Sequence, residues 1–116
     1  MRRIVSLIAV GAAVVGCSTV DPSPKLKAAT AAVEAAKSAG AANFPDSASR
    51  LADAEKYLAA AQGLIKKGDN ADAIQQLTLA SAAADDAKMK ATEQTHIAKS
   101  KELDAQIAEL KAKLGK

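Results

Sequence analysis

The sequence has no tryptophan and only one phenylalanine and one tyrosine among its 116 residues. Strands favour aromatic and β-branched residues, and because both are scarce here, the composition excludes a β-sheet protein. The two aromatic residues, Phe44 and Tyr57, are also too few for a surface on which nucleic-acid bases stack. Glycine-rich phosphate-binding loops are absent as well. We therefore expect no nucleic-acid partner.

Histidine and cysteine each occur once, as His96 and Cys17, and this scarcity limits the chemistry available. A nucleophile needs a nearby base, and neither residue has an evident partner for that role, so we expect no enzyme activity. Glu93 and His96 have the one-turn spacing of a di-iron helical bundle, but such a site needs a second pair and more inward-facing carboxylates. The adjacent pair Asp85 and Asp86 point about 100° apart on a helix, so both are predicted to face solvent. We expect no metal or other cofactor, and we keep a metal-binding or small-ligand-binding module as an alternative.

Alanine is abundant, with 30 of the 116 residues, and it is the strongest helix former. The net charge is only +3, and strong helix formers come in long runs, so folded helices are favoured over disorder. Large apolar side chains are too few for a thick core. The composition therefore predicts a thin, all-α protein.

Residues 1–16 have the pattern of an export signal, because Arg2 and Arg3 precede an apolar run from Ile4 to Val15. This run is shorter than the about 20 residues that a helix needs to cross a bilayer. Removing residues 1–16 takes away two arginines and leaves 14 basic and 13 acidic side chains, a net charge of +1. A basic partner-binding surface is therefore not indicated.

Val14, Val15, Gly16 and Cys17 resemble the lipobox of bacterial lipoproteins. The resemblance implies cleavage between Gly16 and Cys17, a covalent diacylglycerol on the Cys17 thiol and an N-acyl lipid on its new amine. Several acyl chains together give stable membrane anchoring, whereas one chain binds only marginally. Ser18 at the next position implies a lipid-anchored protein of the cell envelope, in the outer membrane and facing the periplasm.

After a polar tether over residues 17–23, two helical segments are predicted. In the first, Ser23 and Pro24 are typical of a helix start, and Gly40 of a left-handed stop. In the second, Asp46 or Ser47 is the expected cap, and Gly68 follows the end at Lys67. The expected packing faces are Leu26, Ala29, Val33 and Ala36 in the first helix, and Leu51, Ala54, Leu58, Ala61 and Ile65 in the second.

A third helix is expected to follow, with Asp69 and Asp72 as a capping arrangement and no glycine or proline before Gly115. If continuous, its ~45 residues reach roughly 67 Å. The apolar periodicity lapses between Thr92 and Glu102, which predicts exposure, fraying or a bend there. The expected packing face before the lapse is Ile74, Leu77, Ala80, Ala84, Ala87 and Ala91.

An apolar stripe then resumes at spacings of 4, 3 and 4 residues, formed by Leu103, Ile107, Leu110 and Leu114. The shorter helices cannot reach it, so it should overhang them and associate with another chain. The predicted fold is an all-α helical hairpin, a short helix plus an antiparallel pair over residues 24–91, with an extended C-terminal helix over residues 92–116. A rod whose three helices do not fold back is the alternative.

The segments Leu51–Leu58, Lys67–Ala73, Leu79–Ala80 and Asp85–Ala87 resemble an uncharacterised alanine-rich domain of small bacterial envelope lipoproteins. In that family the domain occurs alone or ahead of an OmpA-like peptidoglycan-binding domain. The resemblance covers roughly residues 25–90. The family has no established activity, so the resemblance implies a location and an architecture but no mechanism.

These observations predict a non-enzymatic envelope lipoprotein that acts as a structural spacer or docking element, with a second copy or another envelope protein as partner. The murein lipoprotein is joined to peptidoglycan through a C-terminal lysine, and Lys116 stands at the corresponding position of this sequence. The preceding Leu114 and Gly115 depart from that protein's motif. A peptidoglycan-associated, alanine-packed oligomer is therefore a second hypothesis.

Overall fold

The computed structural model describes residues 20–115, of which 91% are helical. The elements are α1 (Ser23–Ser38), the short 3-10 helix η1 (Ala41–Asn43), α2 (Pro45–Lys67) and α3 (Asn70–Leu114). No strand occurs within this range, so the predicted all-α class is confirmed. The predicted export signal, the cleavage position at Gly16 and Cys17, and Lys116 lie outside the described residues.

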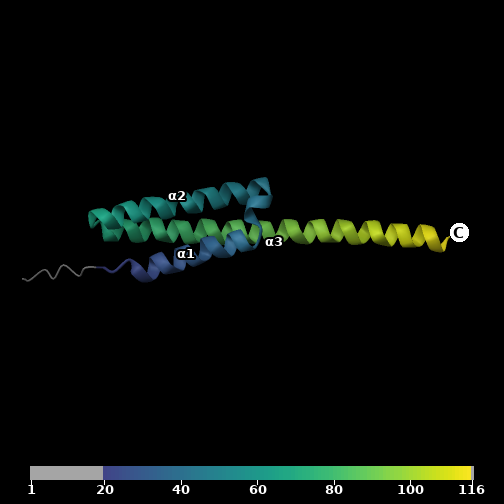
Figure 1. Ribbon diagram of the computed structural model, residues 1–116, viewed down its shortest axis with the longest axis horizontal. Coiled ribbons are helices and arrows are strands. Elements are labelled where there is room, and N and C mark those ends of the chain that lie inside the picture. Colours follow the sequence, from purple (N-terminus) through teal and green to yellow (C-terminus); the bar gives the residue numbers. More distant parts are fainter. Residues whose placement is uncertain (1–19, 116) are drawn as a thin grey trace, which may run out of the picture.

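α1 and α2 both pack along the first half of α3 (Figure 1). α2 and α3 form an antiparallel hairpin, and α1 runs along α3 in the same direction. Both α1 and α2 contact α3 much more extensively than they contact each other. A rod in which the helices do not fold back is therefore wrong, and the predicted hairpin with an overhanging third helix is confirmed.

The core is built almost entirely from alanine. Of its thirteen buried hydrophobic residues, ten are alanine, and the exceptions are Val33, Leu51 and Leu77. Small side chains let the helix axes approach closely, so the bundle is thin and its core alanines are still fully buried. The expected faces of α1 and α2 are buried or half-buried, and on α3 the face begins at Ala73, with Ile74 only half-buried. The buried residues of α3 are Ala73, Leu77, Ala80, Ala84, Ala87 and Ala91.

Glycines in the left-handed region terminate α1 and α2. Gly40 has φ +82° and Gly68 has φ +84°, a conformation that residues with a Cβ rarely adopt. The Gly68 N–H donates to the Ile65 carbonyl, and the Asp69 N–H donates to the Leu64 carbonyl. These bonds satisfy carbonyls at the end of α2, as predicted for a glycine-terminated helix.

The helix starts differ from the predicted caps. In α1 the N-cap position is Pro22 and not Ser23, so no side chain caps the helix from that position, and the Ser23 N–H donates to the Asp21 carboxylate at 2.9 Å. α2 begins at Pro45, and neither Asp46 nor Ser47 caps it. The Ser47 hydroxyl is buried and instead donates back to the carbonyls of Ala41, at 2.6 Å, and Phe44, at 3.1 Å, which holds η1 against the start of α2.

α3 is one uninterrupted helix from Asn70 to Leu114, so the expected bend or fraying between residues 92 and 102 is wrong. No side chain caps its start at Asp69, which corrects the predicted Asp69 and Asp72 capping arrangement. The helix is continuous because residues 70–114 contain neither glycine nor proline and consist mainly of strong helix formers. The exposure predicted beyond Thr92 is observed for the rest of the helix except half-buried Gln94 and Thr95.

Leu77 and Leu79 allow a direct test of this packing. Leu77 is fully buried, whereas Leu79, two residues along the same helix, is 45% exposed. We predict that Leu77→Ala lowers the free energy of unfolding by about 2–3 kcal/mol, because it leaves a cavity where few large side chains exist. Leu79→Ala should change it by less than about 0.5 kcal/mol. Urea unfolding followed by circular dichroism measures both, and equal effects would contradict the assigned burial.

Candidate functional site: the leucine stripe of α3

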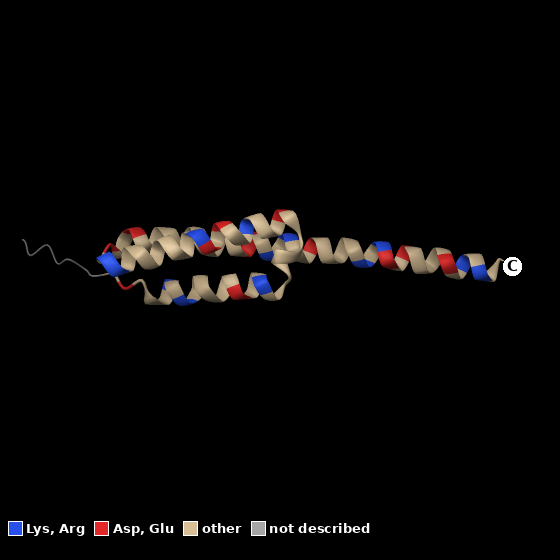
Figure 2. Ribbon diagram, turned by 45° about the horizontal axis from the view of Figure 1, so that its top comes forward, with Lys and Arg blue, Asp and Glu red and all other residues tan. Residues whose placement is uncertain are grey.

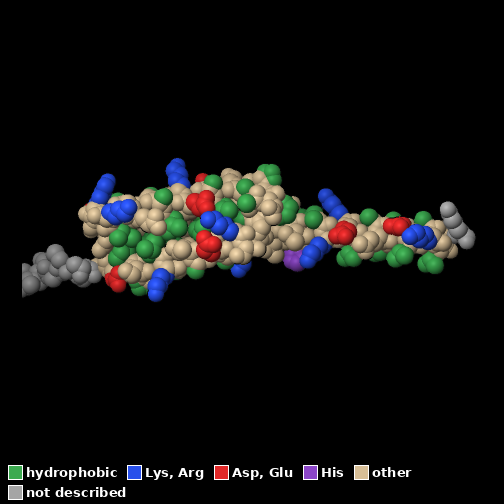
Figure 3. All heavy atoms as spheres, viewed as in Figure 1, with side chains coloured by type: hydrophobic (Ala, Val, Ile, Leu, Met, Phe, Trp, Pro, Cys, Tyr) green, Lys and Arg blue, Asp and Glu red, His purple; other side chains and the backbone are tan. Residues whose placement is uncertain are grey.

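The candidate site is the exposed stripe formed by Leu103, Ile107, Leu110 and Leu114, which we call the leucine stripe. Their exposed fractions are 57%, 49%, 58% and 86%. In the overhanging part of α3 (residues 92–114), Figure 3 shows the larger hydrophobic side chains along the lower edge and smaller ones along the upper edge. Isolated exposed leucines are common, but three leucines and an isoleucine at coiled-coil spacing form a continuous apolar surface of the kind found at helix–helix interfaces.

The leucine stripe lies on a side of α3 that neither α1 nor α2 covers. Residues seven positions apart share a face of a helix with only about 20° of drift. Stepping back by sevens from Leu110 gives positions that are all exposed, including those inside the bundle: Leu103, His96, Met89 and Ala82. Stepping forward by sevens from buried Leu77 gives buried Ala84 and Ala91. The core and the leucine stripe therefore use different sides of one helix.

The core side of α3 also continues beyond the bundle, as an alanine series. Ala98, Ala105 and Ala112 follow Ala91 at seven-residue intervals, and all three are exposed. With about 100° per residue, these alanines point about 180° away from the leucine stripe. The overhang therefore presents two chemically different faces, of which only the leucine stripe offers large apolar side chains.

The leucine stripe stands at the opposite end of the molecule from the start of α1. The start of α1 lies beside the turn between α2 and α3, and the overhang extends away from that end (Figure 1). α2 has 23 residues and α3 has 45, so α2 covers about half of α3. At 1.5 Å per residue, Leu114 lies roughly 65 Å from the start of α3.

Charged residues of both signs are distributed over all three helices and the overhang (Figure 2). Two ion pairs join neighbouring helices: Arg50 Nε lies 2.9 Å from Asp86 Oδ2, and Lys37 Nζ lies 2.8 Å from Glu55 Oε1. Asp86 is thus an interhelical partner, which corrects the expectation that it faces only solvent, whereas Asp85 is exposed as expected.

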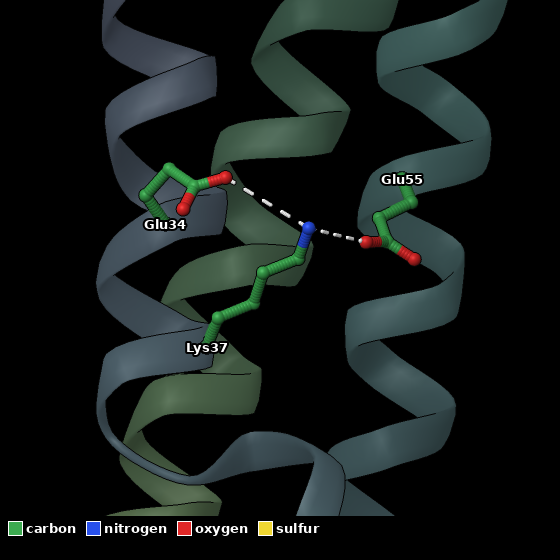
Figure 4. A network of polar contacts seen from close by, with 3 residues as sticks. All are labelled: Glu34, Lys37 and Glu55. Carbon is green, nitrogen blue, oxygen red and sulfur yellow. Dashed lines mark ion pairs between the residues drawn. The ribbon is translucent and has the colours of Figure 1, made fainter.

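Lys37 lies between two carboxylates, Glu55 on α2 and Glu34 on its own helix (Figure 4). The hydrogen bond and negative charge of Glu55 raise the pKa of Lys37 above its ordinary value, and Glu34 adds to the same direction. At the start of α1, hydrogen bonds from Ser23 lower the pKa of Asp21. All of these groups are exposed, so each contact is a solvent-screened surface interaction that contributes little to stability.

A shallow surface hollow on α3 contains Glu93 and His96, the residues of the alternative metal hypothesis. Every residue that lines it comes from α3 itself, so the convex surface of one helix provides no enclosing wall. Within residues 20–115, no three His, Cys, Asp or Glu side chains are grouped to hold a metal ion. The lining residues are Asp85, Asp86, Lys88, Met89, Lys90, Thr92, Glu93 and His96.

None of the helices in residues 20–115 combines the length and the apolar character needed to cross a membrane. Comparison with known proteins finds no matching family model, no matching curated protein and no matching solved structure.

The geometry around His96 generates a prediction for metals. One imidazole and one carboxylate on a convex helix face lack the four ligands of a typical zinc site. In calorimetric titration with Zn²⁺, we expect the parent chain and His96→Ala to give the same weak heat. A strong, saturable signal that His96→Ala removes would contradict this reading and restore the metal-binding hypothesis.

Proposed function

We propose that this chain is a non-enzymatic, lipid-anchored protein of the bacterial cell envelope. In this proposal Cys17 carries the diacylglycerol and N-acyl lipids, and the outer membrane, on its periplasmic side, holds the anchor. The three-helix body is the spacer, and the leucine stripe is a docking element. The observation that carries the proposal is an unbroken α3 whose exposed apolar stripe lies far from the start of α1.

The structure of residues 20–115 supports a spacer in two ways. A continuous helix of 45 residues is a stiff element, because its backbone hydrogen bonds are not interrupted by glycine or proline. α1 and α2 brace only its first half, at the end where the chain enters α1. A protein anchored at that end would therefore present the leucine stripe at a distance from the membrane.

The support for docking is the unusual distribution of apolar side chains. Inside the bundle ten of thirteen buried hydrophobic residues are alanine, whereas beyond the bundle α3 exposes three leucines and two isoleucines, and all of these except Ile97 belong to the leucine stripe. Exposing large apolar groups is unfavourable, while each leucine or isoleucine fully buried is worth about 1.5–3 kcal/mol. This free energy is available to association and not to the fold, because the overhang contacts neither α1 nor α2 beyond its half-buried first turn.

The anchor is tested by labelling with radioactive palmitate in a bacterial host that processes lipoproteins. We predict that the parent chain incorporates the label and stays with the membranes after a salt wash, because several acyl chains anchor stably. Cys17→Ser should lose the label, and Ser18→Ala, which keeps the thiol, should retain it. Unlabelled parent chain, or label that persists in Cys17→Ser, would refute the lipid anchor.

The docking role is tested by placing charge in the leucine stripe. We predict that the double variant Leu103→Asp and Leu110→Asp loses association, because carboxylates cannot enter a dry interface unpaired. Its helix content, by circular dichroism, should stay nearly that of the parent chain. Sedimentation equilibrium of the chain from Ser18 onward, alone and with solubilised envelope proteins, measures association.

The matched control is Ala98→Asp with Ala105→Asp, which adds the same charge at the same spacing on the opposite face of α3. We expect this control to associate as the parent chain does. An undiminished mass of the complex in the leucine-stripe variant would rule out the docking role, whatever the result for the anchor.

A further inference from the structure

The leucine stripe has the side-chain pattern of a two-stranded coiled coil. Its spacings of 4, 3 and 4 residues place Leu103 and Leu110 at d positions and Ile107 and Leu114 at a positions of a heptad repeat. A β-branched residue at a with leucine at d favours two parallel strands, and the central layers here are Ile107 and Leu110. Upstream, the a and d positions are polar, at Ser100, His96 and Glu93, so the apolar seam begins at Leu103.

Charges beside the leucine stripe are complementary between two parallel copies in register. In that arrangement each g residue faces the following e residue of the second copy, which brings Lys99 opposite Asp104. Among residues 20–115, no ion pair within the chain involves Lys99 or Asp104, so both are available to a second copy. By contrast, Lys113, also at a g position, pairs with Glu109 of its own helix at 2.7 Å.

Two copies can approach along this side of α3 because the bundle leaves it open. Ala82, Met89 and His96 are exposed on the same side as the leucine stripe, inside and just beyond the bundle. α1 and α2 of each copy therefore lie away from the seam. A parallel pair also keeps the starts of both α1 helices at the same end, which two copies anchored in one membrane require.

We propose that the leucine stripe docks a second copy of this chain, forming a parallel, in-register two-stranded coiled coil over residues 103–114 with reciprocal Lys99–Asp104 ion pairs. The inference rests on the proposed function and names the partner of its docking element. Four apolar layers make a short seam, so association is weak in dilute solution. Anchoring both copies in one membrane raises their effective concentration and strengthens it.

The test is disulfide cross-linking of the full chain in bacterial membranes. Ser100 occupies an a position next to the seam, so Ser100→Cys places two thiols face to face only in a parallel, in-register pair. We expect mild oxidation to convert most of this variant into a species of twice the chain mass. Ala105→Cys is the matched control on the opposite face, and it should cross-link no more than the parent chain, whose only cysteine is Cys17.

The second copy is overturned as the partner if Ser100→Cys gives no dimer, or if Ser100→Cys cross-links to a different protein. Equal dimer yields from Ser100→Cys and Ala105→Cys would also overturn it, because they show unspecific collision. The docking role itself fails separately, through unchanged association of the Leu103→Asp and Leu110→Asp variant.

A charge exchange tests the direction of the pair in the same membranes. Asp104→Lys should weaken dimer formation on the order of tenfold, because it replaces two ion pairs by two repulsions. Adding Lys99→Asp should restore the dimer, since the two charges are then simply exchanged. Restoration by Lys111→Asp in place of Lys99→Asp would reveal an antiparallel pair, in which Asp104 faces Lys111, and would overturn the parallel arrangement.

Discussion

The continuity of α3 is the constraint on which the rest of the structure depends. Residues 70–114 form one helix, and α1 and α2 can cover only as much of it as their own lengths allow. Burial on α3 ends at Ala91, which shares a core cluster with Ala41 of η1, in the turn that precedes α2. Beyond it only Gln94 and Thr95 are half-buried, and the rest of α3 is exposed for this geometric reason, although the helix itself does not change.

The alanine-rich core has an energetic consequence. A buried methylene contributes about 0.8 kcal/mol, so an alanine contributes much less than a leucine, and ten of thirteen buried hydrophobic residues are alanine. The few larger side chains, Val33, Leu51 and Leu77, therefore fix how the helices fit together. Exposed links such as Arg50–Asp86 are each worth at most about 1 kcal/mol, so they assist the alignment of helices without determining the stability.

The sequence predicted the helices and their packing faces well, because both follow from short-range rules. Gly40 and Gly68 mark helix ends by a conformation that glycine adopts most easily, and the apolar spacing identifies the faces. The caps were less predictable. Serine is a preferred N-cap residue, yet the Ser47 hydroxyl donates to the Ala41 carbonyl. That contact exists only once η1 folds against α2. The ion pair of Asp86 was missed for a similar reason, because it depends on how α2 is rotated about α3.

The predicted bend between residues 92 and 102 shows where periodicity misleads. A lapse in apolar spacing signals that no neighbouring element covers a helix, and it does not signal that the backbone changes. The exposure of the leucine stripe was predictable because it needed only the relative lengths of the helices. Its isolation from the core was not predicted, because a bend expected between residues 92 and 102 leaves undefined the angle between two heptad series, one through Ala84 and Ala91 and one through Leu103 and Leu110.

That phase difference places the packing face and the leucine stripe on different sides of a single helix. If the leucines had continued the series of Leu77, Ala84 and Ala91, the leucine stripe would face the same side as α1 and α2, and a partner docking there would meet the bundle. Because they fall on the side that the bundle leaves exposed, large apolar residues can vary there without altering the core, and the core can remain alanine-lined without weakening the stripe. The packing of the thin bundle and the apolar surface of the overhang therefore depend on different residues of the same 45-residue helix.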